Sequence, residues 1–128
     1  MQFVDTNDDI IVTSAFYIEA YNKMTPENLK RLLSLASMLT MDHPFLFDEN
    51  DIPFTRVSIA SFLNMYPDTF SHFYKKMERN KVMNRFYCSS IHDTSKMYMI
   101  NPLFIRKRGM IEADLSSCIR VLDEGQYK

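Results

Sequence analysis

The stretch that decides the fold is residues 55–80, TRVSIASFLNMYPDTFSHFYKKMERN. Thr55 can cap a short helix, and Asn64 near the end of that helix tolerates a left-handed backbone. Pro67 suits the first position of a second helix, and it pushes the preceding residue, Tyr66, out of the α region. The sequence therefore predicts two helices joined by a tight turn.

The second helix of this pair, about residues 67–80, has two contrasting faces. One face is predicted to be buried, because its apolar residues recur at helical spacing: Phe70, Phe73, Tyr74 and Met77. The other face is polar, with its bases toward the C-terminal half: Asp68, Thr69, Ser71, His72, Lys75, Lys76 and Arg79. Short polar side chains and bases can reach phosphates and base edges. A charged face is also common as a merely solvated surface, so the pattern alone leaves both interpretations open.

On the N-terminal side, Thr25 and Pro26 predict the start of a core helix that runs to about Thr40. Residues 10–12 and 16–21 are rich in β-branched and aromatic side chains, which predicts at least one short strand before that helix. The stripe of the core helix predicted to be buried consists of Leu29, Leu32, Leu33, Ala36 and Leu39 or Thr40.

Further short strands are predicted on both sides of the helix pair. Residues 45–47, Phe-Leu-Phe after a proline, suit a brief edge strand. Residues 82–91 and 96–100 form a predicted β-hairpin, because turn residues separate two aromatic, loosely alternating runs. Residues 106–109, Arg-Lys-Arg-Gly, are predicted to form a basic turn.

The order helix, short strand, short helix, tight turn, longer helix and hairpin predicts the fold class. It is the order of an α+β winged helix-turn-helix domain, in which the helix after the turn enters the major groove and the hairpin lies along the DNA backbone. We therefore expect a flexible leader at residues 1–9 and one winged-helix domain at 10–128. Within that domain the helix-turn-helix spans about 55–80, the wing about 82–100 and a C-terminal helix about 111–123.

Residues 55–77 resemble the helix-turn-helix of MarR-like winged-helix proteins. The strongest marks of that likeness are Ile59-Ala60, Leu63, Thr69, Ser71 and Lys75-Lys76. The hairpin ends in YMINPLFIR at residues 98–106. With this ending the chain is similar to RepL-type replication proteins of Gram-positive plasmids and to related phage proteins, whose wing is followed by an Asn-Pro and an aromatic segment. The resemblance covers roughly residues 16–108.

This resemblance implies a set of DNA-binding residues. The groove-facing set is Thr69, Ser71, His72 and Lys75. The set near phosphates is Lys76 and Arg79, with Arg56 at the start of the preceding helix. On the wing, Arg85 and Lys96 are the candidates for phosphate or minor-groove contact. Asp68 departs from the pattern, because it brings a negative charge close to the expected phosphates.

The charge of the chain is strongly polarised along the sequence. The formal net charge is only −1, although nucleic-acid-binding domains usually carry a basic surplus. Residues 1–54 contain nine acidic and three basic residues, whereas residues 72–108 contain nine basic and two acidic residues. The basic segment is therefore the one expected to meet an anionic partner.

Other function classes have little support in the sequence. The three histidines, His43, His72 and His92, fall on different predicted elements, and the two cysteines, Cys88 and Cys118, lack zinc-ligand spacing. Two glycines cannot form a phosphate-binding loop. No apolar run is long enough to cross a membrane, and the acidic start does not resemble a signal peptide. We expect no catalytic residue, metal, cofactor or membrane partner.

The sequence therefore predicts a cytoplasmic protein that binds double-stranded DNA. The resemblance implies replication initiation or transcription regulation in a plasmid or phage, and proteins that bind two half-sites are commonly homodimers. The alternative is a phage-type module on the same scaffold that binds and modulates a host protein. Its support is the near-zero net charge and an acidic cluster before the helix pair, Asp42, Asp48, Glu49 and Asp51.

Overall fold

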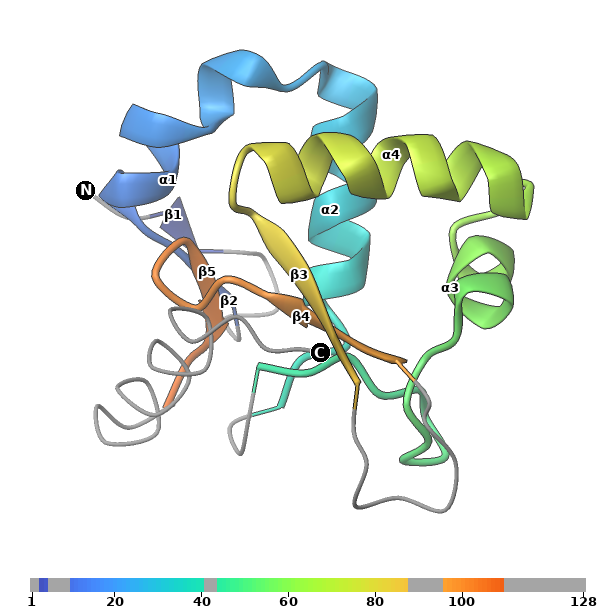
Figure 1. Cartoon of the computed structure of the whole chain (residues 1–128). Coiled ribbons are helices and arrows are strands. Elements are labelled where there is room, and N and C mark those ends of the chain that lie inside the picture. Colours follow the sequence, from blue (N-terminus) through green and yellow to red (C-terminus); the bar gives the residue numbers. More distant parts are fainter. Residues whose placement is uncertain (1–2, 5–9, 41–43, 88–95, 110–128) are drawn as a thin grey trace.

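The chain folds into helices and short antiparallel strands, which confirms the α+β prediction (Figure 1). The computed structural model describes residues 3–4, 10–40, 44–87 and 96–109. The α-helices among them are α1 (Ser14–Glu19), α2 (Pro26–Ala36), α3 (Arg56–Phe62) and α4 (Pro67–Arg79), and a 3-10 turn, η1 (Tyr21–Lys23), follows α1. The strands are β1 (Phe3–Val4), β2 (Ile10–Val12), β3 (Met83–Tyr87), β4 (Lys96–Ile100) and β5 (Ile105–Lys107).

Some predictions fall outside the described residues. They concern residues 1–2 and 5–9 of the predicted leader, the turn of the predicted hairpin at 88–95 and the C-terminal helix at about 111–123.

The described strands form two antiparallel sheets. One sheet has the order β1-β2-β5, and the other is the hairpin β3-β4, in which Arg85 lies opposite Tyr98. The predicted strand at 45–47 is reduced to isolated bridges, one of which joins Phe45 to Met99. The Leu46 N–H also donates to the Tyr98 carbonyl at 2.8 Å. The segment before α3 is therefore attached to the hairpin edge, although it is too irregular to be a strand.

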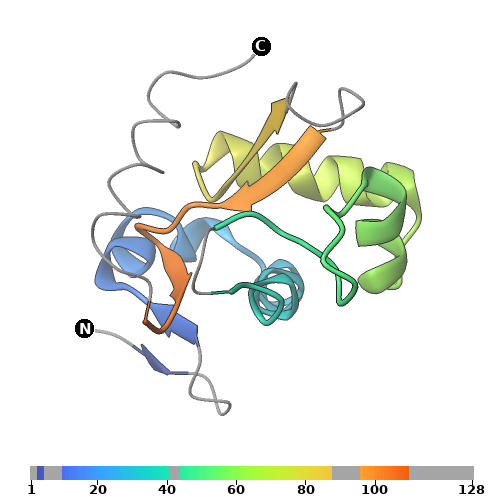
Figure 2. The ribbon, with the colours of Figure 1, turned by 90° about the horizontal axis from the view of Figure 1, so that it is seen from below.

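The two sheets occupy different parts of the molecule. Figures 1 and 2 show the β1-β2-β5 sheet at one end of the molecule beside α1, and α3 at the opposite end. Helix α4 crosses in front of α2, and the hairpin leads away from its C-terminal end (Figure 1). Side chains of α2, α4 and both sheets share one core, represented by Leu32, Phe70, Ile100 and Ile105, each at most 1% exposed.

Helix α2 begins as predicted and ends earlier. The Thr25 hydroxyl accepts from the Asn28 N–H at 3.1 Å, and Pro26 occupies the first turn. The predicted end near Thr40 is wrong: the helix stops at Ala36, because the following N–H groups bond three residues back, as in Leu39 N–H to the Ala36 carbonyl. The fully buried positions include Leu35, which the predicted stripe omits, while Leu29 and Leu33 are half-buried.

The prediction of at least one short strand before α2 is confirmed in the first of its two segments and not in the second. Strand β2 at Ile10–Val12 confirms the first predicted strand. Residues 16–21 are not a strand, because the Thr13 hydroxyl caps α1 by accepting from the Phe16 N–H. Phe16 and Ala20 lie one helical turn apart and are at most 1% exposed. Burial of that pair outweighs the β propensity of the aromatic residues around it.

The predicted basic turn at residues 106–109 is also partly wrong. Ile105–Lys107 form β5, which pairs with β2 and buries Ile105 completely. The turn begins only at Arg108, and Gly109 has φ 98°, a conformation that suits glycine. Strand β4 ends at Ile100, and the next residue, Asn101, stabilises the turn that follows. Its side-chain amide donates to the Lys81 carbonyl at 2.9 Å and accepts from the Leu103 N–H at 2.9 Å.

Candidate nucleic-acid interface

The helix pair α3-α4 forms as the sequence predicts. The Thr55 hydroxyl accepts from the Ser58 N–H at 3.0 Å, and the Ser58 hydroxyl accepts from the Thr55 N–H at 2.8 Å, so α3 starts with a reciprocal capping box. Asn64 adopts φ 62° in the turn, and Pro67 stands at the first position of α4. Local interactions at the start of α3 and in the turn therefore define where each helix of the pair begins and ends.

Helix α4 has the two faces that the sequence predicts. Phe70, Phe73, Tyr74 and Met77 are at most 3% exposed and face the core. Ser71 is half-buried at the edge of the outer face. The predicted DNA-binding residues that are exposed on α4 are Thr69, His72, Lys75, Lys76 and Arg79.

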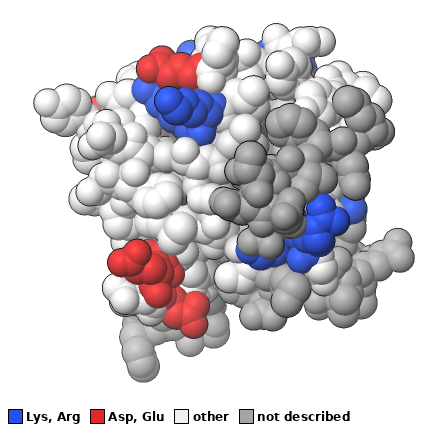
Figure 3. All heavy atoms as spheres, turned by 180° about the vertical axis from the view of Figure 1, so that it is seen from behind, with Lys and Arg blue, Asp and Glu red and all other residues white. Residues whose placement is uncertain are grey.

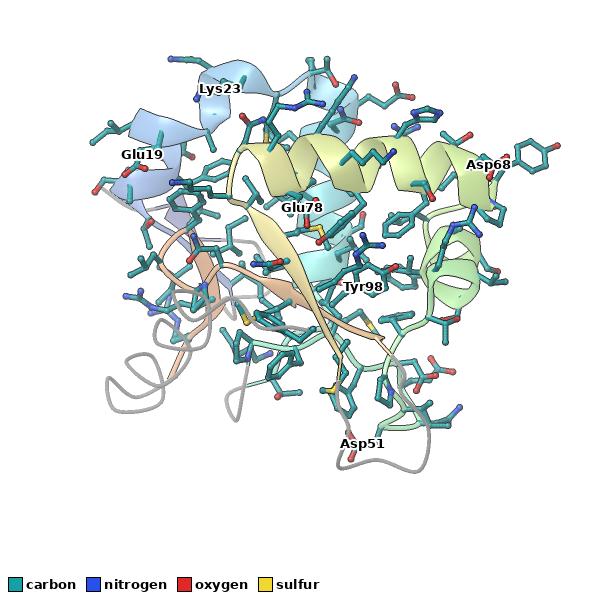
Figure 4. The ribbon with its side chains drawn as sticks, viewed as in Figure 1. Glu19, Lys23, Asp51, Asp68, Glu78 and Tyr98 are labelled. Carbon is teal, nitrogen blue, oxygen red and sulfur yellow. The ribbon has the colours of Figure 1, made fainter. Side chains whose placement is uncertain are left out.

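At its N-terminal end α4 is joined to α3 by a polar cluster of Arg56, Asp68 and Ser71. The Arg56 Nε donates to the Ser71 hydroxyl at 2.8 Å, and one Arg56 Nη donates to Asp68 Oδ1 at 2.7 Å. Figure 4 shows Asp68 at the outer end of α4, and its side chain is 94% exposed. We call these three residues the N-terminal cluster. Its one positive and one negative charge balance each other.

The C-terminal half of α4 is different, because its charges are mostly basic and solvent-exposed. Lys75, Lys76 and Arg79 have exposed side chains there, and we call these three residues the basic half of α4. Glu78, the one acidic residue of this half, accepts from the buried Tyr74 hydroxyl at 3.0 Å and lies toward β3 (Figure 4). The basic half therefore presents a concentrated positive charge to solvent.

Two lysines that the sequence analysis did not select lie beside the basic half. Lys23 of η1 and Lys81 after α4 line a shallow depression that also contains Arg79 and Glu19. Figure 4 shows Glu19 and Lys23 next to the end of α4 that leads into β3. Lys81 belongs to the basic segment, and that position in the sequence indicates a phosphate contact. Lys23 belongs to the acidic N-terminal segment, where nothing in the sequence indicates such a contact.

The predicted wing residue Arg85 packs between the hairpin and α4. Its guanidinium carbon lies 4.8 Å from the centre of the Tyr74 ring, a cation–π distance. Burial raises the pKa of Tyr98, and Arg85 opposes that rise through its charge and a hydrogen bond. Burial, followed by the Glu78 charge and hydrogen bond, raises the pKa of Tyr74 far above its usual value. Arg85 is thus exposed but already held by two tyrosines, and the side chain of Lys96 is not described.

The acidic residues before α3 lie away from the basic half. Asp48 is engaged locally, because its Oδ1 accepts from the Asn50 and Ile52 N–H groups at 2.8 and 3.0 Å. Figure 4 shows Asp51 at the end of the molecule opposite α4. On the face behind α4, acidic and basic residues lie in small scattered groups, and at the top of the view an acidic and a basic group touch (Figure 3). Asp42, also in the predicted acidic cluster, lies outside the described residues.

Two further tests concern other classes of site. In the part of the chain that the structure describes, no group of three or more His, Cys, Asp or Glu side chains could hold a metal ion. None of the described helices is long and apolar enough to cross a membrane. Compared with protein-family models, with curated proteins and with solved structures, the chain gives no match.

Proposed function

We propose that this protein binds double-stranded DNA as a winged helix-turn-helix domain, with α4 in the major groove and the β3-β4 hairpin as the wing. The observation that carries the proposal is the outer face of α4. It exposes Lys75, Lys76 and Arg79 while its opposite face is locked into the core. A rigid helix with exposed bases matches the negative charge and the width of the major groove.

The arrangement of the elements supports the winged-helix interpretation. Helix α2, the segment at 44–47, α3, the tight turn, α4 and the hairpin follow one another in the order typical of that fold. The segment at 44–47 bonds to β4, since the Leu46 N–H donates to the Tyr98 carbonyl and the Ile100 N–H donates to the Pro44 carbonyl at 3.3 Å. It thus takes the place of the short strand that precedes the helix pair in such domains.

The predicted residues would make different contacts in the proposed complex. Thr69 and His72, both exposed near the start of α4, would contact base edges, while the basic half would contact phosphates. Lys23 and Lys81 would extend the phosphate contacts past the end of α4. Arg56 and Ser71 would act first on each other and on Asp68, rather than each alone on DNA.

The direct test is fluorescence anisotropy of a labelled random-sequence duplex titrated with the whole chain. We expect binding that weakens steeply as salt rises, because each phosphate contact releases counterions. A matched single-stranded oligonucleotide and a labelled acidic peptide serve as controls, and both should bind more weakly. Absence of duplex binding at low salt would refute the proposal.

The biological setting follows from the resemblance rather than from the geometry. Similarity to RepL-type proteins favours replication initiation or transcription regulation on a plasmid or phage, in the cytoplasm. A homodimer on two half-sites is expected, and sedimentation of the chain with and without a selected duplex measures it. A single copy bound to one undivided site would contradict that expectation.

A protein-binding role is the second candidate, favoured by an apolar surface on α3 and the turn. Val57 is 60% exposed and Tyr66 is 83% exposed, and both line a shallow groove with Met65 and Pro67. Exposed apolar side chains grouped on one surface are typical of protein contacts. This candidate predicts that duplex anisotropy stays flat at every salt concentration, and that a host protein is bound by the native chain but not by the Val57→Ser, Tyr66→Ser variant.

A further inference from the structure

We propose that Asp68 determines sequence specificity by accepting a hydrogen bond from the amino group of a cytosine, while Arg56 and Ser71 position its carboxylate. This inference rests on the proposed DNA-binding function and adds a base preference to it. It starts from the N-terminal cluster, in which Arg56 contacts Asp68 at 2.7 Å and Ser71 at 2.8 Å.

Asp68 occupies a position from which it can reach DNA bases. It stands in the first turn of α4, the part of a recognition helix that contacts base edges. Its side chain is 94% exposed at the outer end of the helix (Figure 4). Arg56 occupies only Oδ1, and among the described residues nothing bonds to Oδ2. One carboxylate oxygen is therefore available to a ligand.

The negative charge of Asp68 is balanced within the cluster. A lone carboxylate in the groove would be repelled by the phosphates on either side. Here the Arg56 guanidinium lies against it, so the cluster enters the groove with no net charge. The Ser71 hydroxyl accepts from Nε of the same guanidinium, and this holds the Nη group toward Asp68. The cluster thus reduces the repulsion without removing the acceptor.

The four bases differ in the hydrogen-bonding groups that they offer to a carboxylate in the major groove. A carboxylate only accepts hydrogen bonds, so it requires a donor in the major groove. Guanine presents two acceptors there and thymine presents one with a methyl group. Adenine has an amino donor beside the N7 acceptor, which repels a second oxygen. Cytosine presents an amino donor and no acceptor, so it is the base that fits Asp68.

The test is selection from a random-sequence duplex library, followed by anisotropy on duplexes that differ at one base pair. For the native chain we expect one position at which cytosine is preferred by about tenfold. Asp68→Asn should change that position to adenine, because an amide can donate to N7 and accept from N6 at once. Asp68→Ala should remove the preference at that position and leave the others unchanged.

Asp51→Asn is the matched control, because it removes an exposed aspartate far from α4 in a backbone conformation, φ 65°, that asparagine tolerates. It should leave every position of the selected sequence unchanged. Circular dichroism of each variant establishes that the helices persist, so that a change in preference reports on contacts.

The outcomes separate this inference from the function on which it rests. Salt-sensitive binding with no cytosine position, or with a cytosine position that Asp68→Asn leaves unchanged, would overturn the role of Asp68 and leave DNA binding intact. Failure of the native chain to bind any duplex would overturn both. A purely structural role of Asp68 would lower thermal stability in Asp68→Asn without changing base preference.

Discussion

The two ends of α4 differ in how their charges are arranged. At the N-terminal cluster, charges are paired and hydrogen-bonded across the turn to α3, whereas the basic half exposes Lys75, Lys76 and Arg79. Exposed, unbalanced positive charge gives affinity for DNA of any sequence. An oriented hydrogen-bond acceptor without net charge discriminates between bases. In the proposed complex, the basic half would supply affinity and the N-terminal cluster would supply specificity.

The largest expected effect comes from a substitution on the buried face of α4, because the packing of that face holds both ends of the helix in place. Phe70 is 1% exposed, and its ring lies 5.6 Å from that of Tyr98. Phe70→Ala should lower the free energy of unfolding by about 3–5 kcal/mol, because it leaves a cavity under α4. Thermal denaturation followed by circular dichroism measures this loss. An unchanged melting temperature would show that α4 is not packed as described.

The next effect should weaken the basic half alone. Lys75→Ala combined with Lys76→Ala is expected to reduce duplex affinity by about 10- to 100-fold at moderate salt, and to lower the salt slope by about 2. The loss should be the same for every duplex sequence, because phosphates carry no sequence information. Anisotropy at several salt concentrations measures both quantities.

Lys30→Ala is the control for that variant, since it removes an exposed lysine from α2 instead of α4. Its affinity and salt slope should match those of the native chain. A double variant at positions 75 and 76 that binds like the native chain would show that the proposed placement of α4 is wrong.

A third prediction uses pH to probe the packing beneath the basic half. The pKa of Tyr74 is raised by burial and by Glu78, so the folded state retains a proton that the unfolded state releases above pH of about 10. The stabilising contribution of the neutral phenol is present below that pH and is lost as pH rises through the folded-state value. The free energy of unfolding should therefore fall above pH of about 10, and Tyr74→Phe should reduce the steepness of that fall.

Chemical denaturation at a series of pH values measures the slope. Tyr66→Phe is the control, because Tyr66 is 83% exposed in the turn and makes no such contact. If both variants and the native chain show the same dependence on pH, Tyr74 is not buried beside Glu78 in solution as the structure has it.

The smallest expected effect concerns the N-terminal cluster. Ser71→Ala removes the acceptor of Arg56 Nε and should weaken the preference for cytosine by about threefold, with total affinity nearly unchanged. Competition between matched duplexes measures this ratio. Ser61→Ala, which removes an exposed hydroxyl from α3, should have no effect. A uniform loss of affinity in Ser71→Ala would mean that Ser71 contacts the backbone instead.

The helix pair was predictable because its signals are local. Thr55, Asn64 and Pro67 each act within a few residues, and the predicted turn and buried face of α4 agree with the structure. The secondary structure of residues 16–21 and 105–107 was not predictable, since it depends on contacts with residues far away in the sequence. Phe16 packs against Phe104, with ring centres 6.0 Å apart, and β5 forms because β2 lies beside it. Local propensity does not contain such contacts.

The candidate site was predictable as a set of residues and not as an arrangement. Helical periodicity placed Lys75, Lys76 and Arg79 on the solvent face, where the structure has them. The bond from Arg56 to Asp68 depends on how α3 crosses α4, and the position of Lys23 depends on how η1 approaches the end of α4. Neither follows from spacing along the chain.

In the proposed complex the basic half of α4 holds a DNA duplex by its phosphates. The most direct test is the slope of log affinity against log salt concentration, measured by anisotropy for the native chain and the Lys75→Ala, Lys76→Ala variant side by side. We expect a steep negative slope for the native chain and a slope shallower by about 2 for the variant. A flat response of the native chain, or identical slopes for the two proteins, would contradict that expectation.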